Sequence, residues 1–553
     1  MVRMISAWKR PDVDLKFENV SKTLTMTENF RTFASSPRDD PIHTGISVWW
    51  VIFLSLVFRV AFAASIGLGI DEVYMVTAGR ELQLSYFDHP PIAWWMTWIA
   101  SNLPGSLAPV VLRLPFILLF VVSTWLLYSL TSVLFGERAG FWAAVILSIS
   151  PIFGVVFGSW VLPDGPLMAA TLAAVLCLAK LFFIPGTPAA LYWAGAGFFG
   201  GLALLSKYHA VFLFAGTFLF LLTSGRERRW LKRPWPYIGL AIAIALFTPV
   251  LVWNAQHEWV SFDFHRGRSA FETFRPIKSL EVIGLQALFL APWIWIPIVI
   301  ATYHALRRGP ADGRSWFLIC LGIVPPVFFT LVATWSLSQI LAHWMMPGYL
   351  MLIPLLGAAI ARYEVHPANR TRLLAWIWGS VLFLPLATLV VSTELRFGWL
   401  DRVVPAITVK NKPIKELLNK PFKELLYWGE LETALQDRGL LNRRNLFVIA
   451  PKWHEAARAA YALDGDIPVL CISSDRRNFD VFRKLPAYDK EDALIIGKNL
   501  SNDTVENLYG DAFQSIKELP PVTIHHAGRP AILLSIFYAS HFDARALDRL
   551  KRK

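Results

Sequence analysis

Apolar segments of about 20 residues recur along the first 395 residues, and short polar turns separate them. An α-helix needs a run of about this length to cross the hydrocarbon core of a bilayer. The chain of 553 residues is 55% hydrophobic and 17% charged, which is too apolar for a soluble protein of this size. The pattern therefore predicts a polytopic α-helical membrane protein with about 11 to 13 transmembrane helices.

The polar turns divide this region into eleven expected spans. The first of them holds Arg59, which should face the interior of the bundle rather than lipid. The run Ile92–Ile99 is apolar but too short to cross, so we expect a helix that lies in the membrane interface there. By residue number, the spans are expected near 47–70, 110–135, 141–157, 167–184 and 191–205, then one that follows the connection 206–209 and runs to 223, then one ending near 253, then 280–306, 316–335, 344–361 and 373–393.

Lys and Arg set the expected orientation. With the N-terminus in the cytoplasm, the Arg-rich turns 225–236, 307–315 and 362–372 fall on the cytoplasmic side, as the positive-inside rule requires. The net charge of +13 is therefore assigned to membrane topology and not to nucleic-acid binding. The connections that then share the periplasmic face are 71–109, 158–164, 206–209, 254–279 and 336–343, together with everything after 394.

Two acids stand at the end of the first span. Asp71 and Glu72 follow the apolar run directly, and adjacent acids at the mouth of a span are costly unless the loop is wet and functional. Further along the same loop, Pro90 and Pro91 hold Asp88-His89 on extended chain. We interpret this loop as one wall of an active site. The alternative is an interfacial loop whose charges simply face water.

The connection 254–279 breaks the charge rule, because it carries several cations on the periplasmic side. Arg266 and Arg268 have the guanidinium geometry that matches phosphate oxygens, so an anionic headgroup is one expected partner. The alternative is that these cations pair with neighbouring acids of the same loop, such as Asp263.

The composition changes after about residue 396. Short β-rich runs at 446–450, 468–472 and 492–497 predict buried strands, and 522–526 and 531–538 predict two more that close a partly parallel sheet. We expect helices at 427–437, 453–463 and 502–513. The predicted domains are a cytoplasmic tail at 1–45 without a cleavable signal peptide, a transmembrane domain at 46–395 and a periplasmic α/β domain at 396–553 that serves stability or acceptor docking.

Several motifs of the chain occur together in a known order. They are Asp71-Glu72-x-Tyr74, Tyr86-Phe87-Asp88-His89-Pro90-Pro91, Pro163-Asp164-Gly165-Pro166, Ser206-Lys207-Tyr208, Trp253-Asn254 and His343-Trp344-x-x-Pro347. Together they resemble bacterial membrane glycosyltransferases of the GT-C fold. The most similar group is the family 39-like one, which includes lipid A aminoarabinose transferases and rhizobial galacturonosyltransferase-like proteins. The soluble tail, with Asp475-Arg476-Arg477-Asn478, is also similar to an extra domain that some of these proteins carry.

This resemblance implies a polyprenyl phosphate-sugar donor used on the periplasmic side of the bacterial inner membrane. It places Asp71, Glu72 and Asp164 at the catalytic centre. In the aminoarabinose transferases a Lys of the first loop contacts the donor phosphate, whereas His89 stands at the matching position here. The replacement of this Lys by His89 argues against a dedicated aminoarabinose transferase more than against sugar transfer from a lipid phosphate. The substrate-binding residues expected from the motifs and the basic loop are Tyr74, Asp88, His89, Lys207, Tyr208, Asn254, Arg266, Arg268 and His343.

The chemistry of these residues suits glycosyl transfer. Asp71 is the expected base that removes a proton from the acceptor, with Asp164 as a second candidate or as a residue that orients the sugar. Leaving-group stabilisation is expected from Arg266, Arg268, Lys207 or His89. A divalent ion, Mg²⁺ or Mn²⁺, held by Asp71, Glu72 and Asp164 is the alternative.

The expected acceptor is lipid A or the lipopolysaccharide core. Two other functions stay open at this point: a protein O-mannosyltransferase-like enzyme, and a flippase or transporter of lipid-linked sugars. A transporter should show charged residues in mid-span and repeated halves, and only Arg59 favours it. The sequence does not name the sugar.

Overall fold

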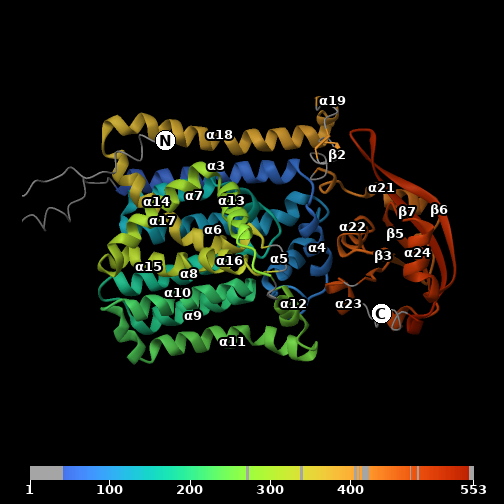
Figure 1. Cartoon of the computed structure of the whole chain (residues 1–553), viewed down its shortest axis with the longest axis horizontal. Coiled ribbons are helices and arrows are strands. Elements are labelled where there is room, and N and C mark those ends of the chain that lie inside the picture. The colour runs from blue at the N-terminus through green and yellow to red at the C-terminus, as the bar shows by residue number, and fades with distance from the viewer. Residues whose placement is uncertain are drawn as a thin grey trace, which may run out of the picture.

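The computed structural model describes residues 41–268, 273–336, 340–403, 408–409, 412–413, 422–473, 475–482 and 485–546. Most of the predicted tail at 1–45 lies outside these ranges. The apolar helices run side by side along the long axis of the molecule, and the α/β domain sits at one end of the bundle (Figure 1).

Each of the eleven expected spans is helical in the described part of the chain. Eight helical stretches are long and apolar enough to cross a membrane, and a bent pair makes a possible ninth. Two expected spans are shorter: α7 (Glu137–Ile149), followed by a π-helical turn, and α10 (Val211–Thr223). The long ones are α3 (Pro41–Ser65), α6 (Pro109–Phe135), α8 (Asp164–Phe183), α9 (Ala189–Ser206), α11 (Trp235–Gln256), α15 (Gly313–Gly322) with α16 (Val324–Val332), α17 (Met346–Glu364) and α18 (Pro367–Phe397).

The eighth expected span, 280–306, is not one straight helix. It consists of α13 (Ile277–Leu290) and α14 (Pro292–Arg308), and the chain bends by 110° between these two helices. Between them Ala291 has a left-handed φ of 72°, and Pro292 has no N–H to continue the helical ladder. The apolar composition continues across this bend, which is why hydropathy alone predicts a single span.

Small residues let the helices approach closely. A Cβ atom at Gly197 of α9 would lie 2.1 Å from the carbonyl oxygen of Gly239 in α11. A Cβ atom at Gly348 of α17 would lie 2.4 Å from the carbonyl oxygen of Gly322 in α15. Such contacts replace the hydrophobic effect as a source of helix association inside lipid.

Arg59 faces the bundle interior, as predicted. Its side chain is 1% exposed, and its guanidinium lies 3.6 Å from the centroid of the Phe120 ring. Nη1 donates to the carbonyl oxygen of Ser55 at 2.8 Å. The charge therefore rests against an aromatic face and a backbone dipole, away from lipid.

The C-terminal domain is a five-stranded sheet in the order β4-β3-β5-β7-β6. Its parallel core and its three predicted helices are confirmed. The predicted helix 502–513 ends earlier, and the predicted short last strands belong to one long hairpin that turns at Ala527-Gly528 with positive φ at both residues. The strands are β3 (Leu446–Ala450), β4 (Val469–Cys471), β5 (Asp492–Lys498), β6 (Phe513–His526) and β7 (Arg529–Phe542), and the helices are α21 (Gly429–Asp437), α22 (Trp453–Ala462), α23 (Asn478–Phe482) and α24 (Asn502–Tyr509).

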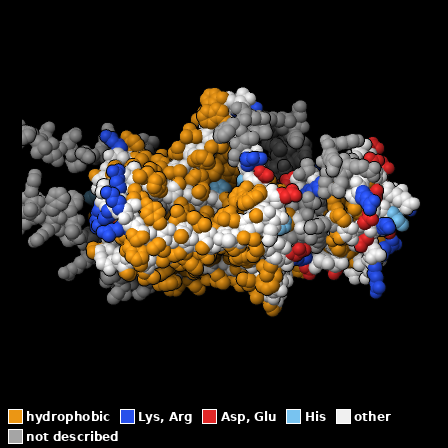
Figure 2. Space-filling view, turned by 90° about the horizontal axis from the view of Figure 1, so that it is seen from below, with side chains coloured by type: hydrophobic (Ala, Val, Ile, Leu, Met, Phe, Trp, Pro, Cys, Tyr) orange, Lys and Arg blue, Asp and Glu red, His pale blue; other side chains and the backbone are white. Residues whose placement is uncertain are grey.

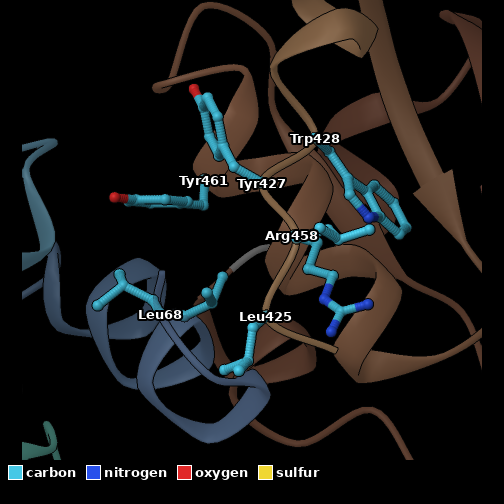
Figure 3. Close-up of a pocket in the computed structure, with 8 residues that line it drawn as sticks. Leu68, Leu425, Tyr427, Trp428, Arg458 and Tyr461 are labelled. Atoms are coloured by element: carbon cyan, nitrogen blue, oxygen red, sulfur yellow. The ribbon is translucent and has the colours of Figure 1, made fainter. Parts of the chain in front are cut away.

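The sheet domain and the first connection of the bundle share one hydrophobic core. That connection forms α4 (Ile70–Gly79) and α5 (Ile92–Ser101), and α5 is the short apolar helix expected there. Buried residues of α4 and α5 belong to the same cluster as Trp428 and the inner face of the sheet. Figure 3 shows this junction, where Leu68 and Leu425 are among the residues that line a cavity of about 20 Å³, enough for one water. The remaining elements near the site end are α12 (Val260–Arg268), α19 (Leu400–Val403) and a β1–β2 pair (Thr408–Val409 and Lys412–Pro413).

The contact between α9 and α11 gives a direct test of this packing. We expect Gly197→Ala to lower the thermal midpoint of the detergent-solubilised protein, because the added methyl would collide with the Gly239 backbone at a cost of about 1–3 kcal/mol. Gly379→Ala on α18 is the matched control, since a Cβ there meets nothing within 4 Å. Equal midpoints for the two variants would contradict the observed packing.

Candidate active site

Glu72 is held by a guanidinium inside the protein. Arg113 of α6 donates Nε to Oε1 at 2.8 Å and Nη2 to Oε2 at 2.6 Å, and both side chains are at most 1% exposed. The backbone N–H groups of Gly69 and Val161 donate to the two oxygens at 2.9 and 3.0 Å. The catalytic role expected for Glu72 stays a prediction, and these contacts describe a structural clamp.

Asp71, one residue earlier, is placed differently. It lies in the first turn of α4 and its side chain is exposed, although many protein atoms surround it. We call the group of Asp71, Asp88, His89, Lys207 and Arg477, whose charges act on one another, the recess. The crowding around this carboxylate raises the pKa of Asp71 because it disfavours the charged form, while Arg477 acts in the opposite direction and Glu72 adds to the increase. An accessible carboxylate with a raised pKa has the properties of a general base.

Asp164 and Lys207 form the second buried ion pair. Lys207 Nζ donates to both carboxylate oxygens of Asp164 at 2.8 Å, and the two residues are 3% and 2% exposed. Asp164 begins α8, and Lys207 follows α9 in an extended conformation, so the pair ties two helix ends together. The expected closeness of these residues to the first loop is supported by the electrostatic effect of Lys207 on both Asp71 and His89.

Asp88 connects the first loop to two other parts of the chain. Its carboxylate accepts from Tyr74 Oη at 3.1 Å and pairs with Arg477 Nη1 at 3.4 Å. Its backbone carbonyl accepts from His265 Nε2 at 2.8 Å. Burial raises the pKa of the Asp88 carboxyl, and Arg477 lowers it. Tyr74, Asp88 and the 254–279 connection are therefore brought together.

Arg477 is the residue of this site that sequence reasoning missed. It comes from the C-terminal domain and has a left-handed φ of 48°. Its guanidinium lies 3.8 Å from the centroid of the Trp453 ring, and its ion pairs with described residues are long, at 3.4 Å with Asp88 and 3.5 Å with Asp475. Burial lowers the pKa of Arg477, and the nearby acids, Asp88 first, more than offset this, so the pKa is raised.

Asn478 fixes the same segment onto the first loop. Its Nδ2 donates to Tyr74 Oη at 2.6 Å, and its Oδ1 accepts from the Phe87 backbone N–H at 2.8 Å. In the sequence, this segment was indicated only by the Asp475–Asn478 motif, through its resemblance to an extra domain of related proteins and not through its chemistry.

His89 lies deep in the same recess. Its ring centroid is 6.0 Å from that of His265 and 6.2 Å from that of Trp94, and Nδ1 has no hydrogen-bond partner among the described residues. Burial and the nearby Lys207 hold the pKa of His89 well below its usual value. The ring is therefore neutral at pH 7, so a phosphate contact there would be a hydrogen bond and not an ion pair.

The other predicted binding residues line the neighbouring helix ends. Tyr208 Oη and Ser261 Oγ are 2.7 Å apart, and Asn254 Oδ1 accepts from the Ser261 backbone N–H at 3.3 Å. Both contacts fix the turn from α11 into α12. His343 is half-buried beside Trp344, with ring centroids 6.4 Å apart.

Of the two predicted phosphate-binding arginines, the structure describes the side chain of Arg266 alone. The side chain of Arg266 is 85% exposed and pairs with Asp263 at 3.3 Å, which supports the alternative that the cations of this loop pair with its own acids. Arg268 is the last residue of α12, and its side chain lies outside the described part of the structure.

The carboxylates of Asp71, Glu72 and Asp164 do not suit the divalent ion that the sequence offered as an alternative. Of the three carboxylates, Glu72 is engaged by Arg113 and Asp164 by Lys207, which leaves Asp71 alone. Within the described ranges, no group of three or more His, Cys, Asp or Glu side chains is arranged to hold a metal ion.

The Glu72 clamp leads to a prediction about folding. We expect Glu72→Gln to lower the stability of the protein by about 3–5 kcal/mol, because Arg113 would remain buried without a counter-charge. The measurement is the yield and thermal midpoint of the purified variant. Wild-type stability with loss of turnover alone would instead support a catalytic Glu72.

Comparisons with known proteins agree with this geometry. Residues 88–253 match the family model described as dolichyl-phosphate-mannose-protein mannosyltransferase. The lipid A galacturonosyltransferase RgtD of Rhizobium johnstonii is 23% identical over 307 residues, which cover 55% of this chain and 62% of the relative. The crystal structure of ArnT from Cupriavidus metallidurans bound to undecaprenyl phosphate superposes with a TM-score of 0.56 at 14% identity, covering 88% of this chain and 97% of ArnT. The apo state of that protein gives a TM-score of 0.56 at 15% identity, with the same coverage. The chain therefore has the GT-C fold of membrane glycosyltransferases, and the resemblance seen in its motifs is confirmed.

Proposed function

We propose that the protein transfers a sugar from a polyprenyl phosphate-sugar donor to lipid A or the lipopolysaccharide core. The observation that carries this proposal is the accessible Asp71 beside the Asp88–Arg477 pair, at one end of a GT-C bundle. The name of RgtD supports lipid A as acceptor, and undecaprenyl phosphate in ArnT supports the class of donor.

The orientation is part of this proposal. Lys and Arg side chains gather at the end of the bundle away from the sheet domain (Figure 2). The positive-inside rule places that end in the cytoplasm, so the site and the α/β domain face the periplasm of the inner membrane. The division into a tail at 1–45, a membrane domain at 46–395 and a periplasmic domain at 396–553 follows from the same argument.

In the proposed reaction, Asp71 takes the proton of an acceptor hydroxyl as the oxygen attacks the anomeric carbon. The bond between that carbon and the phosphate oxygen breaks, and the polyprenyl phosphate leaves with the electron pair. A base is most effective when its pKa is near the working pH, and the raised pKa of Asp71 moves it in that direction. An acceptor phosphate oxygen, already ionised, would need no base.

Arg477 is the best-placed cation for the departing phosphate. Lys207 is already paired by two short hydrogen bonds, His89 is uncharged, and Arg266 is exposed and paired with Asp263. Arg477 is held by Trp453, its ion pairs with described residues are long, and its Nε has no hydrogen-bond partner among them, so the guanidinium retains donor capacity. A guanidinium fork fits phosphate oxygens, and in a recess of low polarity its effect on a developing charge is large.

A second candidate acceptor is a protein hydroxyl. The description of the matched family model, a protein mannosyltransferase, favours it. The two candidates use the same donor chemistry and the same base, so they are distinguished by the acceptor that becomes labelled and not by the site.

One prediction of this proposal concerns the base, Asp71. We expect Asp71→Asn to reduce sugar transfer by about 10²–10⁴-fold while the protein stays folded, because the amide accepts no proton. The assay supplies the purified full chain with polyprenyl phosphate-sugar and membrane lipid extract, and mass spectrometry detects the glycosylated acceptor. Asp263→Asn, an exposed acid at the same end, is the control and should retain activity. Full turnover by Asp71→Asn would contradict the assignment.

Another prediction of this proposal concerns Arg477. We expect Arg477→Gln to lower kcat by about 10²–10³-fold, the usual effect of losing one donor that stabilises charge in the transition state. Because Arg477 lowers the pKa of Asp71, the variant should also shift the acid limb of the pH–rate profile to higher pH. Arg477→Lys should restore part of the rate and the original limb.

Arg476→Gln is the matched control, since Arg476 donates to the Ser473 carbonyl at 2.8 Å outside this cluster. A purely structural role for Arg477 would lower the amount of active protein without moving the pH profile, and that result would reject the proposed contact with phosphate.

A further inference from the structure

A large cavity of the bundle lies far from the candidate active site. It has a volume of about 270 Å³ and is lined by α8, α9, α10 and α11 near the ends that face away from the sheet domain. Leu213, Leu221 and Ala196 form its buried floor, and Phe218 and Leu240 are exposed at its mouth. An apolar cavity that opens on the lipid-facing side of a bundle has the shape to receive part of a hydrocarbon chain.

One polar group in this cavity has no partner. Trp193 lines the wall and is 5% exposed, and its Nε1–H has no hydrogen-bond partner among the described residues. A buried donor without an acceptor is costly in an apolar surrounding. A ligand that brings an oxygen acceptor to this depth would remove that cost.

The rim of the cavity is strongly basic. The turn from α10 to α11 holds five cations, Arg226, Arg228, Arg229, Lys232 and Arg233, against the single acid Glu227. Glu227 pairs with Arg226 at 3.1 Å and with Arg229 at 3.7 Å, whereas Lys232 and Arg233 are exposed. Leu231 and Pro236 of the same turn line the cavity, so Lys232 and Arg233 belong to the segment that forms part of its wall.

We propose that the cavity and this basic turn form a binding site for one anionic phospholipid. One acyl chain occupies the apolar cavity, an ester or phosphate oxygen accepts from Trp193 Nε1, and the headgroup phosphate pairs with Lys232 and Arg233. Basic pockets between transmembrane helices are the form that recognition of anionic lipids usually takes. The site is independent of the sugar-transfer site, which lies at the opposite end of the bundle.

The test uses the full chain in detergent, titrated with phosphatidylglycerol or phosphatidylcholine and analysed by native mass spectrometry. We expect one phosphatidylglycerol to be retained in preference to phosphatidylcholine. Lys232→Gln/Arg233→Gln should weaken its binding about thirtyfold, since each of the two cations near a lipid phosphate contributes about one kcal/mol. The matched control is Arg370→Gln/Arg372→Gln, which changes two exposed arginines near the start of α18 at the same end of the bundle. This variant should bind as the wild type does.

A second variant tests the cavity itself. Leu240→Trp adds bulk at the exposed mouth without disturbing the buried floor, and it should abolish retention of the lipid. Trp193→Phe should weaken binding severalfold by removing the donor. Equal retention of both lipids would overturn the proposed headgroup recognition. Retention of phosphatidylglycerol by a correctly folded Leu240→Trp variant would show that the lipid binds elsewhere and would overturn the site.

Discussion

The buried contact between Arg113 and Glu72 organises the site end of the molecule. Arg113 uses its five N–H donors on Glu72 and on the carbonyl oxygens of Ala63, Ile66 and Gly67. One guanidinium thus joins the end of α3, the start of α4 and the body of α6. Glu72 extends the network to the Val161 backbone. Full saturation of donors and acceptors makes a buried charge tolerable in a membrane protein.

This clamp also explains why two adjacent acids differ in character. Glu72 is neutralised and fixed, whereas Asp71, on the next face of α4, is left accessible at a defined position. The Asp164–Lys207 pair similarly fixes the ends of α8 and α9 beside the recess. The proposed reactive carboxylate is therefore held by neighbours whose own charges are already paired, which is the arrangement that preorganisation requires.

The sequence predicted what depends on local pattern. Apolar length located the eleven helical segments, and β-rich runs located the strands of the parallel core, because burial of those segments is visible in their own composition. The bend at Ala291 was missed, since a left-handed residue inside an apolar run leaves hydropathy unchanged. Arg113 left a signal that was not used: like Arg59, it is a charge inside an apolar span and needs an interior partner.

Arg477 was beyond prediction for a different reason. It reaches Asp88 from 389 residues away, and such a contact depends on how two folded units dock. The docking is secured by the hydrophobic core that α4 and α5 share with the sheet domain, so the α/β domain is an integral part of the recess. The expectation that this domain serves stability or acceptor docking omitted such a contribution, because its strands and helices predict only a fold.

The one connection that broke the charge rule holds several of its cations by contacts of its own. In 254–279 and the following turn, Arg266 pairs with Asp263, Lys278 pairs with Glu281, and His265 donates to the Asp88 carbonyl. Ion pairs also occur at the opposite end of the bundle, where Arg308 pairs with Asp312. The positive-inside rule counts Lys and Arg whether or not an acid is near, so such pairs do not decide orientation. They do bear on the site chemistry, because a cation held by its own acid has less donor capacity left for the phosphate of a ligand.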